Sequence, residues 1–262
     1  MDIVVCVKQV PEAADIGWDP DRGTLVREGI AGILNPNDKN ALEAALQLKE
    51  KHGGLVTAVS MGPEQADETL REALSLGIDK AILLCDRRFA GADTLSTAYT
   101  LSLALKKIAR FDLILCGKES ADGMTAHVGP QLAEMLDLPQ LTCATEIDIH
   151  GSSVQIRQKL ENEYRVLESP LPAVITVERE INQPRITSME LVLEACRDKE
   201  VFVWGAEELG GEVENFGLKG SPTQSSKVYT QKVIRGTVKT LKGDVETIAR
   251  DFIEILNQKN LI

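Results

Sequence analysis

The chain has 262 residues, a formal net charge of −11 and only 4% aromatic residues. A chain of this length can bury one substantial core, or one domain of ordinary size with an appendage. The negative charge argues against a nucleic-acid surface, which depends on clustered Lys and Arg, and the scarcity of aromatics argues against base-stacking platforms. A small phosphate site made of backbone amides is compatible with both properties.

The cysteines, histidines and apolar runs indicate whether the protein has disulfides, a metal site or a membrane span. The five cysteines include no CxxC pair and the three histidines are scattered, so we expect free thiols and no metal site. No apolar run approaches the roughly 20 residues that cross a bilayer, and no basic stretch precedes the short apolar run at the start. We therefore expect a cytoplasmic protein without a membrane span.

The first half of the chain alternates apolar strand patterns with amphipathic helical patterns. Strands are predicted at 2–7, 55–60, 81–85 and 111–115, and helices at 37–51, 63–76, 93–109 and from Val128 onward. This alternation predicts an α/β fold with a doubly wound, mostly parallel sheet covered on both faces. Ligands of such sheets bind beyond the carboxyl ends of the strands, where residues 60–62, 86–94 and 117–125 should converge.

The pattern changes after Pro139. Short strands are predicted at 145–149, 154–158, 164–167 and 173–177, as an antiparallel extension at one edge of the sheet. Residues 18–23 have the turn chemistry of a small hairpin. Residues 205–227, rich in Gly, Ser, Glu and Pro, predict an extended arm that leads to an amphipathic helix at about 244–256. This helix either packs on its own domain or covers a partner.

Residues 117–130 form the most informative stretch. An apolar strand pattern opens there into a loop rich in Gly, Asp and Thr, followed by the helical pattern from Val128. Such a junction directs backbone N–H groups and the positive end of a helix to one point, which predicts an anion site. A plain loop with a helix cap fits the same residues.

A similar junction lies at residues 91–97. Asp93 is a good helix N-cap, Gly91 allows close approach of the backbone, and the hydroxyls of Thr94 and Thr97 can reach a pyrophosphate. A well-capped helix entry is the plainer alternative. The absence of GxGxxG, GxxxxGK[ST] and GxSxG motifs argues against a standard dinucleotide fold, a P-loop and a hydrolase.

A series of short segments adds a family resemblance. They are 5–11 (VCVKQVP), 34–38 (LNPND), 48–51 (LKEK), 59–63 (VSMGP), 117–123 (GKESADG), 138–140 (LPQ), 172–176 (PAVIT) and 181–185 (INQPR). In this order they resemble the beta subunit of electron transfer flavoprotein over nearly the whole chain. No single segment is specific, but their order is.

Two loops are similar to the electron-bifurcating branch of that family. They are 86–94 (DRRFAGADT) and 122–130 (DGMTAHVGP), the second of which resembles the DGDTAQVGP of bifurcating members. Met124 departs from a common Asp, His127 departs from a common Gln, and residues 119–120 replace a frequent Gln-Ala. These departures affect the polar contacts of the loop rather than its backbone.

The resemblance implies a beta subunit that binds FAD, with NAD(H) as the electron donor that passes hydride to this flavin. One electron would pass to ferredoxin or flavodoxin, and the other, through the FAD of the alpha subunit, to a flavin-dependent dehydrogenase of the acyl-CoA or hydroxyacid type. The alternative is a non-bifurcating beta subunit that holds AMP in the same pocket and carries electrons from dehydrogenases. A nucleotide-binding sensor, a structural scaffold and an ATP pyrophosphatase-like enzyme are further candidates, although the SGGxDS loop of the enzyme is missing after the first strand.

The resemblance also implies the site residues, none of them catalytic and none a metal ligand. The expected cofactor-binding residues are Cys6, Val7, Asn35, Pro36, Ser60, Met61, Phe89, Gly91, Ala92, Asp93, Thr94, Thr97, Gly117, Asp122, Gly123, Met124, Thr125, Ala126, His127 and Val128. Phe89 is alternatively an ordinary core aromatic, and His127 alternatively a solvated surface histidine.

A docking segment is expected at residues 186–195, which correspond by order to the family's recognition loop. Met189 occupies the register of an exposed Leu anchor, and Leu191 is a second apolar anchor. The alternative is that these apolar residues at helical spacing belong to the core.

The family resemblance also implies a division into two parts. Residues 1–204 are expected to form a nucleotide- and FAD-binding α/β domain, and residues 205–262 an arm and helix that contact the alpha subunit.

Overall fold

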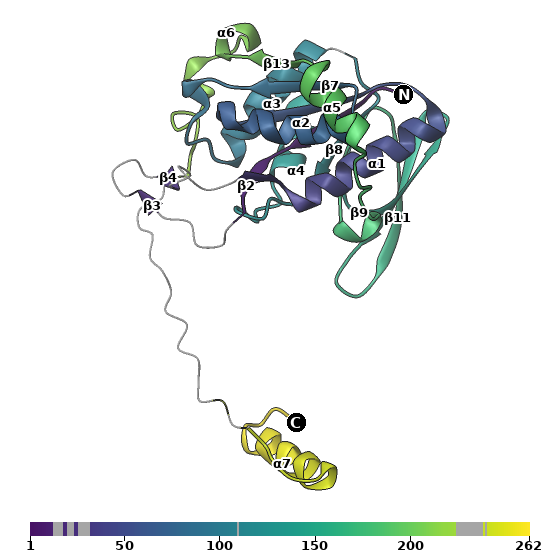
Figure 1. The fold of residues 1–262 in the computed structure, drawn as a ribbon, viewed down its shortest axis with the longest axis vertical. Helices are drawn as coiled ribbons and strands as arrows, with labels where there is room; N and C mark the ends of the chain where they lie inside the picture. The colour runs from purple at the N-terminus through teal and green to yellow at the C-terminus, as the bar shows by residue number, and fades with distance from the viewer. Residues whose placement is uncertain (13–17, 20–23, 26–31, 109, 224–237, 239) are drawn as a thin grey trace. The chain divides into compact units, whose positions relative to one another are not determined.

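The computed structural model describes residues 1–12, 18–19, 24–25, 32–108, 110–223, 238 and 240–262. The chain divides into two compact units, Met1–Ser225 and Ser226–Ile262. Figure 1 shows the ribbon of both units. The first unit contains the sheet and all of the predicted site residues, so it is described first.

A nine-stranded sheet forms the centre of the first unit, in the order β11-β10-β9-β12-β8-β1-β6-β7-β13. Its strands are β1 (Ile3–Val7), β6 (Val56–Met61), β7 (Lys80–Leu84), β8 (Leu113–Gly117), β9 (Gln140–His150), β10 (Ser153–Lys159), β11 (Tyr164–Pro170), β12 (Ala173–Val177) and β13 (Val201–Trp204). The seven strands β9-β12-β8-β1-β6-β7-β13 of this order are parallel to their neighbours. The other two form the antiparallel part, in which β10 pairs with β9 and with β11. The predicted doubly wound, mostly parallel sheet with an antiparallel extension is confirmed.

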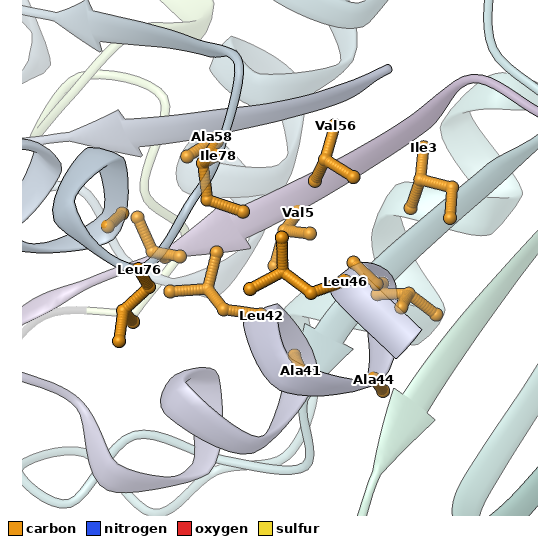
Figure 2. Packing of buried hydrophobic residues seen from close by; sticks show 14 of the residues in the cluster. Ile3, Val5, Ala41, Leu42, Ala44, Leu46, Val56, Ala58, Leu76 and Ile78 are labelled. Carbon is orange, nitrogen blue, oxygen red and sulfur yellow. The ribbon is translucent and has the colours of Figure 1, made fainter. Parts of the chain in front are cut away.

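Helices cover both faces of this sheet. They are α1 (Pro36–His52), α2 (Asp67–Ser75), α3 (Thr94–Ile108), α4 (Val128–Leu136), α5 (Met189–Arg197) and α6 (Ala206–Leu209). One buried cluster joins α1, α2 and α5 to one face, and a second joins α3, α4 and α6 to the other. Figure 2 shows the first cluster, in which Leu42 and Leu46 of α1 point toward Val5 and Val56 of the strands. Alternate residues of β1 enter the two clusters, as the period of a strand requires.

Shorter elements complete the unit. They are β2 (Gln9–Pro11) paired with β5 (Gly32–Leu34), β3 (Trp18–Asp19) paired with β4 (Thr24–Leu25), and the 3₁₀ turns η1 (Glu64–Ala66), η2 (Arg87–Phe89), η3 (Arg179–Ile181) and η4 (Val213–Asn215). The β3–β4 pairing agrees with the predicted hairpin, although its turn, 20–23, lies outside the described residues. None of the described helices is long and apolar enough to span a membrane.

The position of β12 differs from the sequence-based expectation. The pattern after Pro139 predicts it in the antiparallel extension, but it lies inside the sheet, parallel to both β8 and β9. All five of its residues are buried. A strand covered on both faces is typically a nearly continuous apolar run, which β12 is apart from the buried Thr176, whereas β10 alternates between buried and half-buried residues at its start.

Residues 206–223 also differ from the expected extended arm. They form α6 and η4 and pack on the α/β core, where Phe216 is 2% exposed. The Phe216 ring lies 5.1 Å from the Phe89 ring and 5.4 Å from the Tyr99 ring, measured between centroids. Phe216, together with the buried Ala206 and Leu209, therefore anchors a segment in which apolar residues are sparse.

The second unit contains the predicted C-terminal helix, α7 (Val245–Gln258). Asp244 caps it by accepting a hydrogen bond from the backbone N–H of Thr247 at 2.8 Å. Its apolar residues Val245, Phe252 and Ile253 are exposed within the described structure. The amphipathic pattern is thus present, and none of the described residues of this unit covers its apolar face.

Candidate functional site

The topology places a switch point at β1. This strand pairs with β6 on one side and with β8 on the other, so the chain leaves the centre of the sheet in both directions. Open α/β sheets bind ligands beyond the carboxyl ends of the strands at such a point. The candidate site therefore begins where β1 ends at Val7 and β8 ends at Gly117.

Asp38, in the first turn of α1, joins these two strand ends. Its buried carboxylate accepts hydrogen bonds from the backbone N–H of Lys8 at 2.8 Å and of Gly117 at 3.2 Å. Burial raises the pKa of Asp38 to about 7, against the lowering effect of these hydrogen bonds. A Cβ on Gly117 would meet the Asp38 carboxylate and come within 2.7 Å of the backbone carbon of Asn37, so this close approach requires glycine.

The turn before α1 holds the loop that follows β8. Asn35 donates its side-chain amide to the carbonyl of Glu119 at 3.0 Å and accepts from the backbone N–H of Ala121 at 3.0 Å. Asn37 donates to the same carbonyl at 2.8 Å. Pro36 starts the helix between them, at a position where its missing N–H is not needed. Asn35 and Pro36 thus shape the loop through contacts within the protein.

An ion pair fixes the far end of this loop. The Lys8 ammonium lies 2.7 and 2.8 Å from the two carboxylate oxygens of Asp122, whose side chain is 6% exposed. It also donates to the Ser120 hydroxyl at 3.4 Å. Lys8, Asn37 and Asp38 are not among the predicted site residues, although they lie in the segments that carry the family resemblance. The contacts of Lys8 and Asn37 join residues as far as 114 and 82 positions apart, which no local pattern reveals.

The tip of the loop has an unusual backbone. Met124 and Ala126 have φ values of 46° and 56°, in the left-handed region that non-glycine residues rarely adopt. Met124, Thr125 and His127 are exposed. Strain of this kind persists where the surrounding structure imposes it, and it is often found at ligand sites. The exposure of His127 agrees with its description as a surface histidine.

The N-terminus of α4 follows this tip and carries no side-chain cap. His127, at the N-cap position, makes no side-chain hydrogen bond to the first turn. The leading N–H groups of a helix need an acceptor, and an anion can supply it. Val128 is therefore the first residue of an open helix end beside the strained loop.

The N-terminus of α3 differs, because Asp93 already occupies it. One carboxylate oxygen accepts from the N–H groups of Leu95 and Ser96 at 3.0 and 3.1 Å, and the other accepts from the Thr223 hydroxyl at 2.6 Å. The predicted N-cap is thus present. Burial raises the pKa of Asp93, but these hydrogen bonds outweigh it and leave the pKa below its usual value.

The loop from Phe89 to Asp93 is covered by residues 217–223. The Leu218 N–H donates to the Ala90 carbonyl at 3.0 Å, and the Asp93 N–H donates to the Ser221 hydroxyl at 2.8 Å. Gly91 has φ 74°, and Leu218 packs beside it, while Ala92, Thr94 and Thr97 continue into α3. Phe89 is 5% exposed and belongs to the core, in agreement with the plainer of its two interpretations.

The remaining predicted site residues lie at the ends of β1 and β6. Ser60 pairs in register with Val7, and its fully buried hydroxyl has no hydrogen-bond partner among the described residues. Cys6 faces Cys116 of β8 in register, and both thiols are free. Met61 packs on the same cluster as α3 and α4. The hydrogen bond to Cys6 and burial raise the pKa of Cys116, so this thiol is not poised for reaction.

The predicted docking residues lie at the start of α5, where Ser188 caps the helix. Met189 is 74% exposed, whereas Leu191 is half-buried. Ala195 is buried against the core, so one face of the helix does belong to the core. Ile186, which is 96% exposed, is a further apolar residue of this segment that the sequence pattern does not single out.

Over the described ranges, no group of His, Cys, Asp or Glu side chains is arranged to hold a metal ion. The arrangement at the carboxyl ends of β1 and β8 consists of a loop fixed by an ion pair and, beside it, the open N-terminus of α4 with its backbone N–H donors. Such a set can bind a phosphate-containing ligand, and the residues described above include no nucleophile with an associated base.

Comparisons with known proteins bear on this geometry. Residues 22–208 match the family model for the electron transfer flavoprotein domain. The chain is 44% identical over its full length to an electron transfer flavoprotein subunit beta of Clostridium acetobutylicum, which is covered completely. It is 39% identical, with both chains fully covered, to the caffeyl-CoA reductase-Etf complex subunit CarD of Acetobacterium woodii. It is also 44% identical to the protein FixA of Azorhizobium caulinodans over 87% of this chain and 84% of that protein.

Proposed function

This chain belongs to the electron transfer flavoprotein family, as a relative of its beta subunits, and from that premise we propose that it binds FAD at the carboxyl ends of β1 and β8. The observation that carries the proposal is the open N-terminus of α4 beside the loop that Lys8, Asn35 and Asp38 hold in place. A flavin nucleotide brings phosphates that satisfy such a helix end.

The residues at this edge of the sheet fit a nucleotide. The Lys8 ammonium balances the charge of Asp122, whereas Asp38 accepts hydrogen bonds from backbone N–H groups that it holds in place. The buried Ser60 hydroxyl has no hydrogen-bond partner among the described residues, and a bound ligand can supply one. When bound, FAD supplies the hydride and one-electron chemistry, while the chain supplies position and local charge.

We extend the proposal to the electron route. The subunit works with an electron transfer flavoprotein alpha subunit, receives hydride from NADH, and divides the electrons between ferredoxin or flavodoxin and a flavin-dependent dehydrogenase. The name of the A. woodii relative, a subunit of a caffeyl-CoA reductase-Etf complex, supports an acyl-CoA type of dehydrogenase over a hydroxyacid type. The exposed Met189 and Ile186 supply apolar contacts for it.

A second candidate is a non-bifurcating beta subunit with AMP in the same pocket. The observation that favours it is the start of α3, where Asp93 already satisfies the first turn. Only one of the two expected helix ends is then open, and one open end suits a single phosphate. Both candidates place the phosphate at α4, so they differ in what else the pocket holds.

Steady-state reduction tests the bifurcating proposal. The chain is co-produced with its alpha subunit and supplied with NADH and oxidised ferredoxin, with or without an acyl-CoA dehydrogenase and its enoyl-CoA substrate. The proposal requires ferredoxin reduction that depends on the presence of the dehydrogenase and its substrate. Ferredoxin that stays oxidised while the heterodimer still carries electrons to or from the dehydrogenase would support the AMP-containing candidate.

A further inference from the structure

α1 carries a polar stripe along one side, and the stripe is buried at its start. Asn40, Glu43, Gln47 and Glu50 follow one another at intervals of three, four and three residues, which aligns them along one face of the helix. Asn40 and Glu43 are both 5% exposed. Burying an amide and a carboxylate is costly unless each is paired, so their partners show what the stripe holds.

The first partner is the backbone that follows β12. The Asn40 amide donates to the carbonyl oxygens of Arg179 and Asn182 at 3.1 and 2.9 Å, and the Asn182 amide donates back to the Asn40 carbonyl at 3.0 Å. These reciprocal bonds fix one point of the chain on the helix. The two bonds from Asn40 hold backbone carbonyl groups, so they fix the path of the chain from Asn182 onward.

The second partner is Arg185. Its guanidinium donates to the two Glu43 oxygens at 2.8 and 3.1 Å and to Glu50 at 2.7 Å, and its backbone N–H also donates to Glu43 at 3.1 Å. Gln47 donates to Glu43 from the same stripe at 2.9 Å. Burial raises the pKa of Glu43, but the Arg185 hydrogen bonds outweigh it and hold the pKa below its usual value.

The chain leaves these contacts with its apolar side chains outward. Ile186 follows Arg185 directly and is 96% exposed, and Met189 is 74% exposed. Between them the Thr187 hydroxyl donates to the carbonyl of Ser75, the last residue of α2. In Figure 1 the green chain that leads into α5 crosses α1. Arg185 of this part of the chain contacts Glu43 of α1. The segment 182–189 is thus tied to two helices while its apolar residues face solvent.

The same helix also holds the candidate nucleotide site. Asn37 and Asp38, shortly before Asn40, bind the carbonyl of Glu119 and the N–H groups at the ends of β1 and β8. A single helix of 17 residues therefore contacts both the loop after β8 and the segment 182–189. An α-helix is stiff over this length, so it sets the distance between them.

We propose that the polar stripe of α1, through Asn40 and the Glu43–Arg185 pair, positions the segment 182–189 for docking at a set distance from the nucleotide site. The proposal rests on the proposed function for its statement that a dehydrogenase docks here. Arg185 and Glu43 are positioning residues, because they act through the backbone that they hold. Fixing an apolar contact in advance reduces the entropy lost on docking.

Three variants of the co-produced heterodimer test this. Arg185→Lys keeps the charge and loses the planar fork, whereas Arg185→Gln leaves the buried Glu43 carboxylate without its cation. The double variant Glu43→Gln with Arg185→Gln restores a neutral pair that can hydrogen bond. Arg165→Lys is the matched control, because Arg165 forms an exposed pair with Glu163. An acyl-CoA dehydrogenase is the electron acceptor, and amide hydrogen exchange is measured on residues 182–197.

We expect Arg185→Lys to raise the KM for the dehydrogenase about tenfold, the equivalent of one lost charge-assisted hydrogen bond, with kcat and nucleotide content unchanged. Exchange of residues 182–192 should accelerate, Arg185→Gln should have the larger effect, and the double variant should recover part of it. A merely structural role predicts instead that kcat and nucleotide content fall together while KM stays constant.

Two outcomes would overturn the proposal. One is an unchanged KM together with unchanged hydrogen exchange in both Arg185 variants. The other is an equal loss of nucleotide from the Arg185 variants, which would make the stripe a general element of folding. If the wild-type heterodimer does not exchange electrons with the dehydrogenase, the docking part of the proposed function fails. Hydrogen exchange then decides by itself whether the stripe positions the segment.

Discussion

Replacing Phe216 with Ala tests whether residues 206–223 are part of the α/β core. The ring is 2% exposed and packs on the Phe89 and Tyr99 rings at centroid distances of 5.1 and 5.4 Å. Truncating a buried Phe to Ala costs about 3 to 5 kcal/mol, because burial is lost and a cavity remains. A typical domain has a free energy of unfolding of about 5 to 15 kcal/mol, so the effect should be large.

The assay is equilibrium unfolding of the full chain in urea, followed by far-ultraviolet circular dichroism. Val213→Ala is the control, because Val213 lies in the same segment but is 45% exposed. We expect about 0.5 kcal/mol or less for the control, as for most surface changes. A loss below about 1 kcal/mol for Phe216→Ala would refute the packing argument, since it would show that the segment behaves as a solvated arm.

Three further predictions concern the site and its surroundings. Gly123→Val should lower nucleotide content without unfolding the chain, because an added side chain crowds the loop beside Ser120; unchanged nucleotide content would count against this loop as the site. Because burial raises the pKa of Asp38 to about 7, the folded protein keeps a proton that the unfolded chain releases, so the free energy of unfolding should fall as pH rises from about 4 to about 7 and then level off. Urea unfolding of Asp38→Asn should lack this part of the fall, and a pH profile like that of the wild type would contradict the assignment. Met189→Ala should weaken electron transfer to the dehydrogenase and spare NADH-dependent reduction of the bound flavin; a parallel loss of both would place Met189 in the core.

The sequence predicts the framework of the sheet because its signals are local. The apolar runs and helical periods that mark β1, β6, β7, β8, α1 and α3 each lie within one element, and the structure contains those elements at nearly the expected bounds. β12 shows the limit of the local pattern, because the two strands before it in the sequence, β10 and β11, pair antiparallel, whereas β12 pairs parallel to β8 and β9. Its five consecutive buried residues distinguish it from the alternating β10, since a continuous apolar run is typical of a strand buried on both faces.

Other features depend on contacts that no local pattern contains. Phe216 is one aromatic in a stretch with little periodicity, so its burial against Phe89 follows only from the fold. Lys8 and Asp122 are 114 residues apart, and their ion pair forms because β1 and β8 are neighbours. Within the candidate site, family resemblance therefore directs attention to the loops, while the structure distinguishes the residues that hold those loops from those that remain open to a ligand.

The most direct test of the central claim is a count of the nucleotides released when the purified alpha–beta heterodimer is denatured, by chromatography against standards of FAD and AMP. We expect two FAD per heterodimer, and a lower FAD content in the Gly123→Val variant. One FAD and one AMP would contradict the assignment of FAD to this chain and support the non-bifurcating candidate. A single FAD without AMP, unaffected by Gly123→Val, would contradict nucleotide binding at the ends of β1 and β8.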